Sequence, residues 1–144
     1  KEYFFLKQIY ENISNFFIKL AEINLEQISS ENFNDSSQQK GVSFENDCLD
    51  ILKTNGWNVQ NTPKTNDQGA DLIAIKGMLK IIFQCKNYRN PVGNDAIQQV
   101  LSAKQFYQGT VAAVISNSGY TNSARQLSKK TDVLLMNMDD LKKI

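Results

Sequence analysis

Residues 71–86 read DLIAIKGMLKIIFQCK, and this stretch decides the fold. Its two apolar runs flank Gly77, and their content of Ile, Leu and Phe predicts a pair of strands joined by a turn. Side chains two positions apart on a strand point to the same face, so we expect Gln84 and Lys86 to project together. An amide and an ammonium on so apolar a strand are costly to bury without partners. A carboxylate such as that of Asp71 would supply one.

Helices alternate with strands on both sides of this hairpin. Spacings of three and four residues between apolar positions indicate the helices, and short apolar runs bounded by Gly, Pro or polar residues indicate the strands. The expected helices are 3–28, 42–55, 94–107 and 121–130, and the expected strands are 57–61, 71–76, 79–86, 111–115 and 133–136. This alternation predicts an α/β domain with a mixed central sheet flanked by helices.

The first 40 residues differ from the rest. Their helix carries an apolar stripe, formed by Leu6, Ile9, Ile13, Phe16, Leu20 and Ile23 and widened by Phe4, Phe5 and Phe17. The stripe predicts either packing against the main domain or a homodimer through this helix. Residues 29–40 are polar and rich in Ser and Asn, as linkers are. We therefore expect an N-terminal amphipathic helix plus linker in residues 1–40 and one domain in residues 41–144.

The composition excludes several kinds of site. The chain has no histidine, which rules out zinc-histidine hydrolysis, Ser-His and Cys-His triads and histidine acid–base catalysis. Cys48 and Cys85 lack partners at metal-ligand spacing, so we expect neither a zinc site nor a disulfide framework, and a cytoplasmic location fits. Charged residues such as Lys7 and Glu11 interrupt the apolar N-terminal region, so no membrane segment is expected.

The net charge of +1 is unevenly distributed. Residues 1–40 hold four Lys and six acidic residues, whereas residues 41–144 hold twelve Lys and Arg and nine acidic residues. From Lys76 to Lys130 there are eight basic residues and one acidic residue, Asp95. This excess suits a polyanion such as double-stranded DNA, although an ordinary solvated surface explains the charge alone equally well.

Spacing alone leaves two interpretations of Gln84 and Lys86, a functional site or the solvent-exposed end of an edge strand. Additional motifs favour the first. In chain order they are Gly41–Glu45, Gly56-Trp57, Thr62-Pro63, Asp67–Leu72, Gln84–Lys86, Tyr88, Pro91–Gly93, Gln98, Asn117–Thr121 and Ala124-Arg125. With these motifs, residues 41–141 resemble the catalytic domain of Mrr-type restriction endonucleases, in the PD-(D/E)xK nuclease superfamily. The resemblance implies a restriction-endonuclease-like αβββαβ core and a divalent-metal-dependent DNA endonuclease.

The resemblance also implies a catalytic set of four residues. Asp71 and Glu45, together with the Cys85 carbonyl, would bind Mg²⁺, or Mn²⁺ in its place. Lys86 would orient the attacking water and offset phosphate charge. Gln84 stands where many members of the superfamily carry Glu or Asp, and it offers an acceptor oxygen without a charge. Metal affinity should therefore fall unless Glu45 compensates.

DNA contacts are expected from residues that follow the Gln-x-Lys motif and from a later helix. The candidates are Asn87, Arg89, Thr121, Arg125 and Lys129. A helix N-terminus with a hydroxyl, as at Thr121, can hold a phosphate, and such contacts give affinity without base readout. Asp67 is a weaker acidic candidate. Two alternatives stay open: a non-cutting DNA-binding or assembly module with this fold, and a junction-resolving or repair nuclease of the same superfamily.

Overall fold

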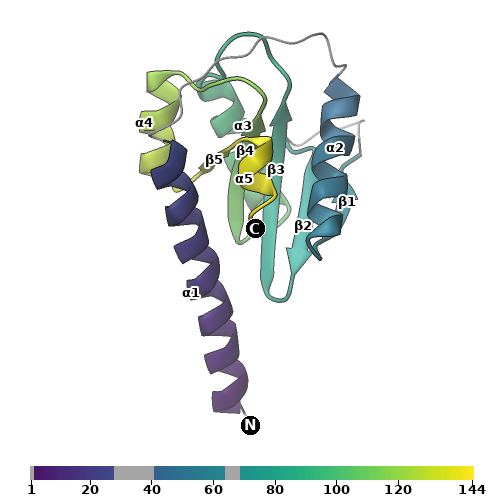
Figure 1. The fold of residues 1–144 in the computed structure, drawn as a ribbon, viewed down its shortest axis with the longest axis vertical. Helices are drawn as coiled ribbons and strands as arrows, with labels where there is room; N and C mark the ends of the chain where they lie inside the picture. Colours follow the sequence, from purple (N-terminus) through teal and green to yellow (C-terminus); the bar gives the residue numbers. More distant parts are fainter. Residues whose placement is uncertain (1, 28–40, 64–68) are drawn as a thin grey trace.

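The computed structural model describes residues 2–27, 41–63 and 69–144. The expected linker and Asp67 lie outside these residues. In chain order the elements are α1 (Glu2–Gln27), α2 (Gly41–Thr54), β1 (Asn58–Asn61), β2 (Leu72–Lys76), β3 (Leu79–Lys86), α3 (Asn94–Phe106), β4 (Val111–Ser116), α4 (Asn122–Thr131), β5 (Leu134–Met136) and α5 (Met138–Leu141) (Figure 1). Each element expected from the sequence is present with slightly different ends, and α5 is an addition.

The five strands form one mixed sheet in the order β1-β2-β3-β4-β5. β1, β2 and β3 form an antiparallel meander, in which Leu72 pairs with Phe83. β4 then pairs parallel with β3, with Val114 beside Gln84, and β5 pairs parallel with β4. Because β3 is the central strand, the interpretation of Gln84 and Lys86 as residues of an edge strand is wrong.

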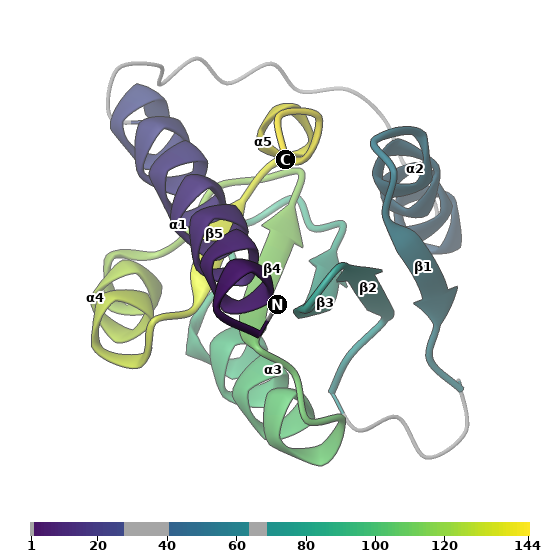
Figure 2. The same cartoon turned by 90° about the horizontal axis from the view of Figure 1, so that it is seen from below.

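Helices cover both faces of the sheet, as the alternating pattern predicts. One core lies between the sheet and α1, α2 and α5, and a second lies between the sheet and α3 and α4. Figure 2 shows α3 and α4 on the opposite side of the sheet from α2 and α5. β3 contributes to both cores, because Ile81 and Phe83 face the first and Ile82 faces the second. The apolar content of β3 follows from this burial on both faces.

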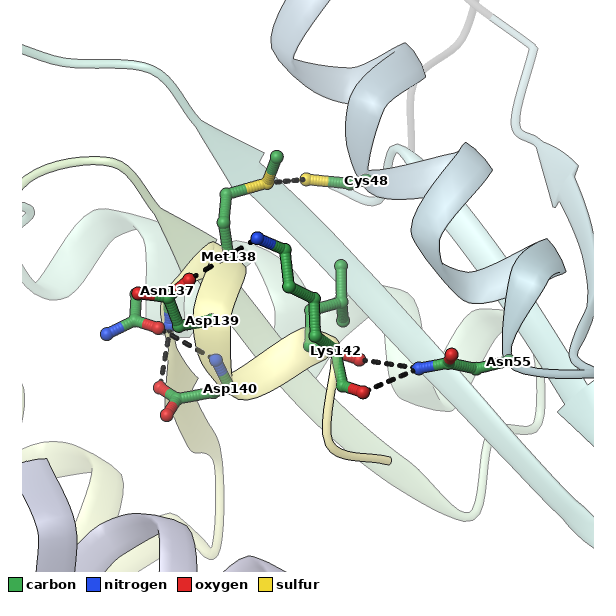
Figure 3. A network of polar contacts seen from close by, with 8 residues as sticks. Cys48, Asn55, Asn137, Met138, Asp139, Asp140 and Lys142 are labelled. Carbon is green, nitrogen blue, oxygen red and sulfur yellow. Dashed lines mark hydrogen bonds and ion pairs between the residues drawn. The ribbon is translucent and has the colours of Figure 1, made fainter.

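α5 follows β5 at a position where the sequence indicated no further element. Asn137 starts it with a capping box, in which Asn137 accepts from the Asp140 N–H and Asp140 accepts from the Asn137 N–H. Two contacts then hold α5 against α2 (Figure 3): Asn55 Nδ2 donates to the Lys142 carbonyl at 2.9 Å, and Cys48 Sγ lies 3.4 Å from Met138 Sδ. The last residues of the chain therefore close the first core.

α1 packs against the domain with its C-terminal half. Phe16 and Leu20 are buried in the first core, and the rings of Phe16 and Trp57 meet edge to face at 6.0 Å between centroids. The N-terminal half extends beyond the rest of the molecule in Figure 1, and Leu6 and Tyr10 on it are 62% and 74% exposed. Among the described helices, none has the length and apolar character needed to span a membrane.

Candidate active site

Asp71 lies at the end of the sheet where β2 begins. Its N–H donates to the Phe83 carbonyl at 2.8 Å, which extends the β2–β3 ladder by one residue beyond the strand. Its carboxylate oxygen Oδ2 accepts the N–H of Cys85 at 2.7 Å. A carboxylate is thereby fixed against the backbone of the Gln-x-Lys motif. The sequence predicted this proximity, although it placed Asp71 inside the strand.

Gln84 and Lys86 point to the same face of β3, as their spacing predicts. Gln84 is only 5% exposed, and the amide orientation that satisfies both neighbours lets its nitrogen donate to the Gly69 carbonyl. Its oxygen then accepts from Lys86 Nζ at 3.3 Å. Lys86 Nζ also lies 5.4 Å from the centroid of the Tyr88 ring, within the range of a cation–π contact. The ammonium is thus held from two sides.

Gly69 brings the loop before β2 close to α3. Its φ of +84° suits glycine, and a Cβ there would lie 2.5 Å from the Gln99 carbonyl oxygen. Any other residue would push the loop away from α3. Since the Gly69 carbonyl is the acceptor for the buried Gln84 amide, this close approach also determines where Gln84 points.

Glu45 approaches from the other layer of the molecule. It lies on α2, which packs on the first core, whereas Gln84 and Lys86 share the face of Ile82 in the second core. Asn61 Nδ2 donates to Glu45 Oε1 at 3.4 Å. Glu45 therefore lies in the layer on the opposite face of the sheet from the side chains of Gln84 and Lys86.

The thiol of Cys85 responds to both carboxylates. A hydrogen bond with the Cys48 side chain and burial raise the pKa of Cys85 well above its usual range, and the negative charges of Asp71 and Glu45 add smaller contributions. Both cysteines are free thiols, as expected.

These donors fit a hard divalent cation. Within the described ranges, no three His, Cys, Asp or Glu side chains are grouped so that they alone could hold a metal ion. Two carboxylates and a main-chain carbonyl are nevertheless a sufficient protein contribution for Mg²⁺, which retains several waters and binds substrate phosphate. The Asp71 carboxylate, which the Cys85 N–H fixes at 2.7 Å against the Gln-x-Lys motif, is the observation that favours a cation here.

The expected DNA contacts lie beyond the carboxyl ends of β3 and β4. Asn87 and Arg89 follow β3, and Arg89 is exposed. Thr121 is the N-cap of α4, where its hydroxyl accepts from the Ala124 N–H at 3.0 Å, as predicted. Arg125 and Lys129 are exposed on α4. Asn87, Arg89 and Thr121 belong to two neighbouring connections, which main-chain hydrogen bonds between Val92 and residues 119–121 hold together.

Sequence reasoning missed the residues that support the site. Gly69 and Tyr88 were noted only as parts of motifs, and Asn117 was given no role. The strand order could have indicated residues such as Asn117, because loops that follow two adjacent parallel strands meet at one edge of the sheet. That signal requires knowing that β3 and β4 are neighbours.

A family model described as restriction endonuclease, the Mrr catalytic domain, matches residues 37–144. The chain belongs to this restriction endonuclease family. Three-quarters of the sequence lies within the match, and the Asp71, Gln84 and Lys86 positions are all included. The resemblance in the sequence motifs is thereby confirmed, and residues 37–144 are a nuclease domain of the Mrr type.

Solved structures share the fold of this Mrr-type domain. A protein of unknown function superposes with a TM-score of 0.54 at 12% identity, over 65% of this chain and 57% of its own. The structure of an EndoMS complex with double-stranded DNA superposes with a TM-score of 0.51 at 13% identity, and the match covers 76% of this chain and 48% of that one. A repair endonuclease from Pyrococcus abyssi superposes with a TM-score of 0.50 at 14% identity, and the match covers 76% of this chain and 49% of that one. The Mrr-type domain thus spans about half the length of these proteins. A search of curated protein sequences gives no significant match.

Proposed function

We propose that this chain is a divalent-metal-dependent DNA endonuclease that hydrolyses phosphodiester bonds, with a role in restriction. The observation that carries the proposal is the arrangement of Asp71, Gln84 and Lys86 at one end of the sheet. The Asp71 carboxylate is bonded to the motif backbone, and Lys86 is held by Gln84 at 3.3 Å. A carboxylate and an ammonium that are both fixed at the same end of the sheet suit a reaction that involves a cation and a phosphate.

Asp71, Glu45 and the Cys85 carbonyl would hold Mg²⁺, with Mn²⁺ as a substitute. The bound cation would supply Lewis-acid chemistry, lowering the pKa of the attacking water and offsetting charge on the phosphate. Asp71 is oriented for this role by the N–H of Cys85. Glu45 contributes a second charge from α2, which compensates for the neutral side chain of Gln84.

Lys86 would contact the reacting phosphate or the attacking water. Its ammonium donates hydrogen bonds and stabilises negative charge that develops on the phosphate oxygens. Gln84 is buried and bonded to Gly69, so its role in this proposal is to orient Lys86 and not to bind metal. Its neutral amide suits that role, because Nε2 donates to a carbonyl while Oε1 accepts from the ammonium.

Double-stranded DNA would lie across the connections that follow β3 and β4. Asn87, Arg89 and the α4 residues Thr121, Arg125 and Lys129 would contact its phosphates. Arg125 and Lys129 are four positions apart and both exposed, so they lie on one side of α4. Contacts of this kind predict affinity that falls with salt and depends little on base sequence.

We further infer that a second copy of the chain pairs with the N-terminal half of α1. Leu6 continues the helical stripe that Ile13, Phe16 and Leu20 bury against the domain, yet it is 62% exposed. Tyr3 and Tyr10 beside it are 82% and 74% exposed. An identical stripe from a second chain would cover this surface and bring two nuclease sites to one DNA duplex.

The nuclease proposal is tested by incubating the protein with supercoiled plasmid in Mg²⁺, Mn²⁺ or EDTA. Nicking or linearisation with either metal, and none with EDTA, is the expected result. Methylated and unmethylated plasmids run in parallel identify any dependence on DNA modification. Intact plasmid in every lane, despite retained DNA binding, would contradict the assignment of an endonuclease.

A further inference from the structure

Asn117, the first residue after β4, contacts three consecutive residues at the end of β3. Its main-chain N–H donates to the Lys86 carbonyl at 3.4 Å. Its side-chain oxygen accepts from the Tyr88 N–H at 2.8 Å, and its side-chain nitrogen donates to Asn87 Oδ1. One residue therefore fixes the backbone of the chain as it leaves the Gln-x-Lys motif.

The segment that Asn117 fixes determines the surroundings of the Lys86 ammonium. Lysine carries its charge on a flexible four-carbon stem, so the position of Nζ depends on what surrounds it. One neighbour is the Gln84 oxygen at 3.3 Å, and the other is the Tyr88 ring at 5.4 Å. Tyr88 is 49% exposed, so packing holds its ring only in part, and the ring follows the backbone bonded to Asn117.

Other hydrogen bonds hold the rest of the connection without Asn117. Ser118 Oγ donates to the Asn90 carbonyl at 2.9 Å, and the Val92 N–H donates to the Gly119 carbonyl at 2.8 Å. The Thr121 N–H donates to the Val92 carbonyl at 3.0 Å. Loss of the Asn117 side chain should therefore release the Tyr88 N–H without unfolding the domain.

We propose that Asn117 is a positioning residue that sets the location of the Lys86 ammonium for catalysis. The inference rests on the proposed nuclease function, in which Lys86 faces the phosphate or the attacking water. A displacement of about 1 Å in a reacting group lowers the rate by up to roughly a hundredfold. Because Asn117 acts through Lys86, its loss affects the chemical step more than DNA affinity.

The kinetic test measures single-turnover cleavage of plasmid DNA in Mg²⁺ for the wild-type protein and three variants. Asn117→Ala should lower the rate constant by about tenfold or more, with DNA affinity changed less than about threefold. Asn117→Asp should recover most of the rate, because its carboxylate accepts from both the Tyr88 N–H and a rotated Asn87 amide. The control, Asn90→Ala, removes an amide from the same connection but keeps the carbonyl that Ser118 bonds.

A second readout does not depend on activity. Because Lys86 Nζ lies 5.4 Å from the Tyr88 ring centroid, the ring current should shift the NMR signals of the Lys86 ε-methylene protons, and this shift should disappear in Asn117→Ala and return in Asn117→Asp. An unchanged shift in Asn117→Ala, or a rate within twofold of wild type, would overturn the positioning role. If the wild-type protein cleaves no DNA, the nuclease function itself has failed, and the NMR result still decides whether Asn117 positions Lys86.

Discussion

Gln84 and Lys86 illustrate how far single residues can be predicted. Their placement on one face follows from the two-residue period of a strand, so the sequence predicted it directly. The carbonyl of Gly69 as the partner of Gln84 could not be predicted, because it depends on how closely the preceding loop approaches Gln99 on α3. The alternation of side chains along a strand is a local property, whereas the hydrogen-bond partner of Gln84 depends on tertiary packing.

Lys86 should be essential for catalysis and dispensable for folding. Lys86→Ala is expected to lower the cleavage rate by about 10²–10³-fold, since it removes an ammonium placed at the reacting group. Fluorescence anisotropy with a labelled duplex should show DNA affinity within a few-fold of wild type. Lys86→Met controls for the length of the side chain and should be equally inactive. Substantial cleavage by either variant would remove Lys86 from the mechanism.

The buried hydroxyl of Tyr120 should make the stability of the domain depend on pH in the alkaline range. Its hydroxyl lies 2.7 Å from the Met136 carbonyl and 2.9 Å from the Val114 carbonyl, and burial raises the pKa of Tyr120 above its ordinary value. The neutral phenol therefore contributes stability that is complete below about pH 10, the unfolded value, and is lost at higher pH.

Tyr120→Phe tests this contribution. At pH 7 the variant should be less stable by about 1–3 kcal/mol, because two buried carbonyls lose a donor. Urea unfolding at pH 7 and at pH 11 should show that the difference in the free energy of unfolding between wild type and variant becomes smaller as the pH rises. A gap that stays constant over this range would mean that Tyr120 ionises as freely in the native state as in the unfolded chain.

At the scale of elements, α1 and α5 mark what periodicity can and cannot predict. The stripe of α1 identified a helix and its buried face, and Phe16 and Leu20 do pack in the core. The pattern does not indicate where along the helix the domain ends, because Leu6 repeats the spacing but is exposed. α5 has four residues, too short for a period, and depends on its Asn137 cap and its contacts with α2.

Phe16 should anchor α1 to the domain. Phe16→Ala is expected to lower the free energy of unfolding by about 3–5 kcal/mol, because the ring is 7% exposed and packs on Trp57. Phe4→Ala removes the same ring from a position that is 72% exposed and should cost less than about 1 kcal/mol. Equal losses in chemical denaturation would show that α1 does not dock through this face.

The exposed half of α1 should control association. Sedimentation equilibrium of the wild-type chain is expected to give a dimer, and Leu6→Lys should shift it to a monomer, because a charge would have to be buried in the interface. Lys7→Glu changes a charge on an exposed neighbour and serves as the control. A wild-type chain that remains monomeric at high concentration would contradict the pairing.

At the scale of the whole molecule, the helix layers on the two faces of the sheet meet at the end of the sheet where the site lies. The order of helices and strands predicted the mixed sheet, which the strand pairing confirms, and the sequence motifs predicted the family, which the family match confirms. It did not predict that Glu45 would come from the layer opposite Gln84 and Lys86, because the sequence order alone does not assign each helix to a face.

The most direct measurement compares cleavage of supercoiled plasmid by the wild-type protein and by Asp71→Ala in Mg²⁺, with DNA binding measured on the same samples. Asp71 both accepts the Cys85 N–H and supplies the proposed metal carboxylate. We expect nicking or linearisation by the wild type, no detectable cleavage by a folded Asp71→Ala, and similar DNA affinity for both. Undiminished cleavage by Asp71→Ala would place catalysis elsewhere, and DNA binding without cleavage by the wild type would indicate a non-cutting module.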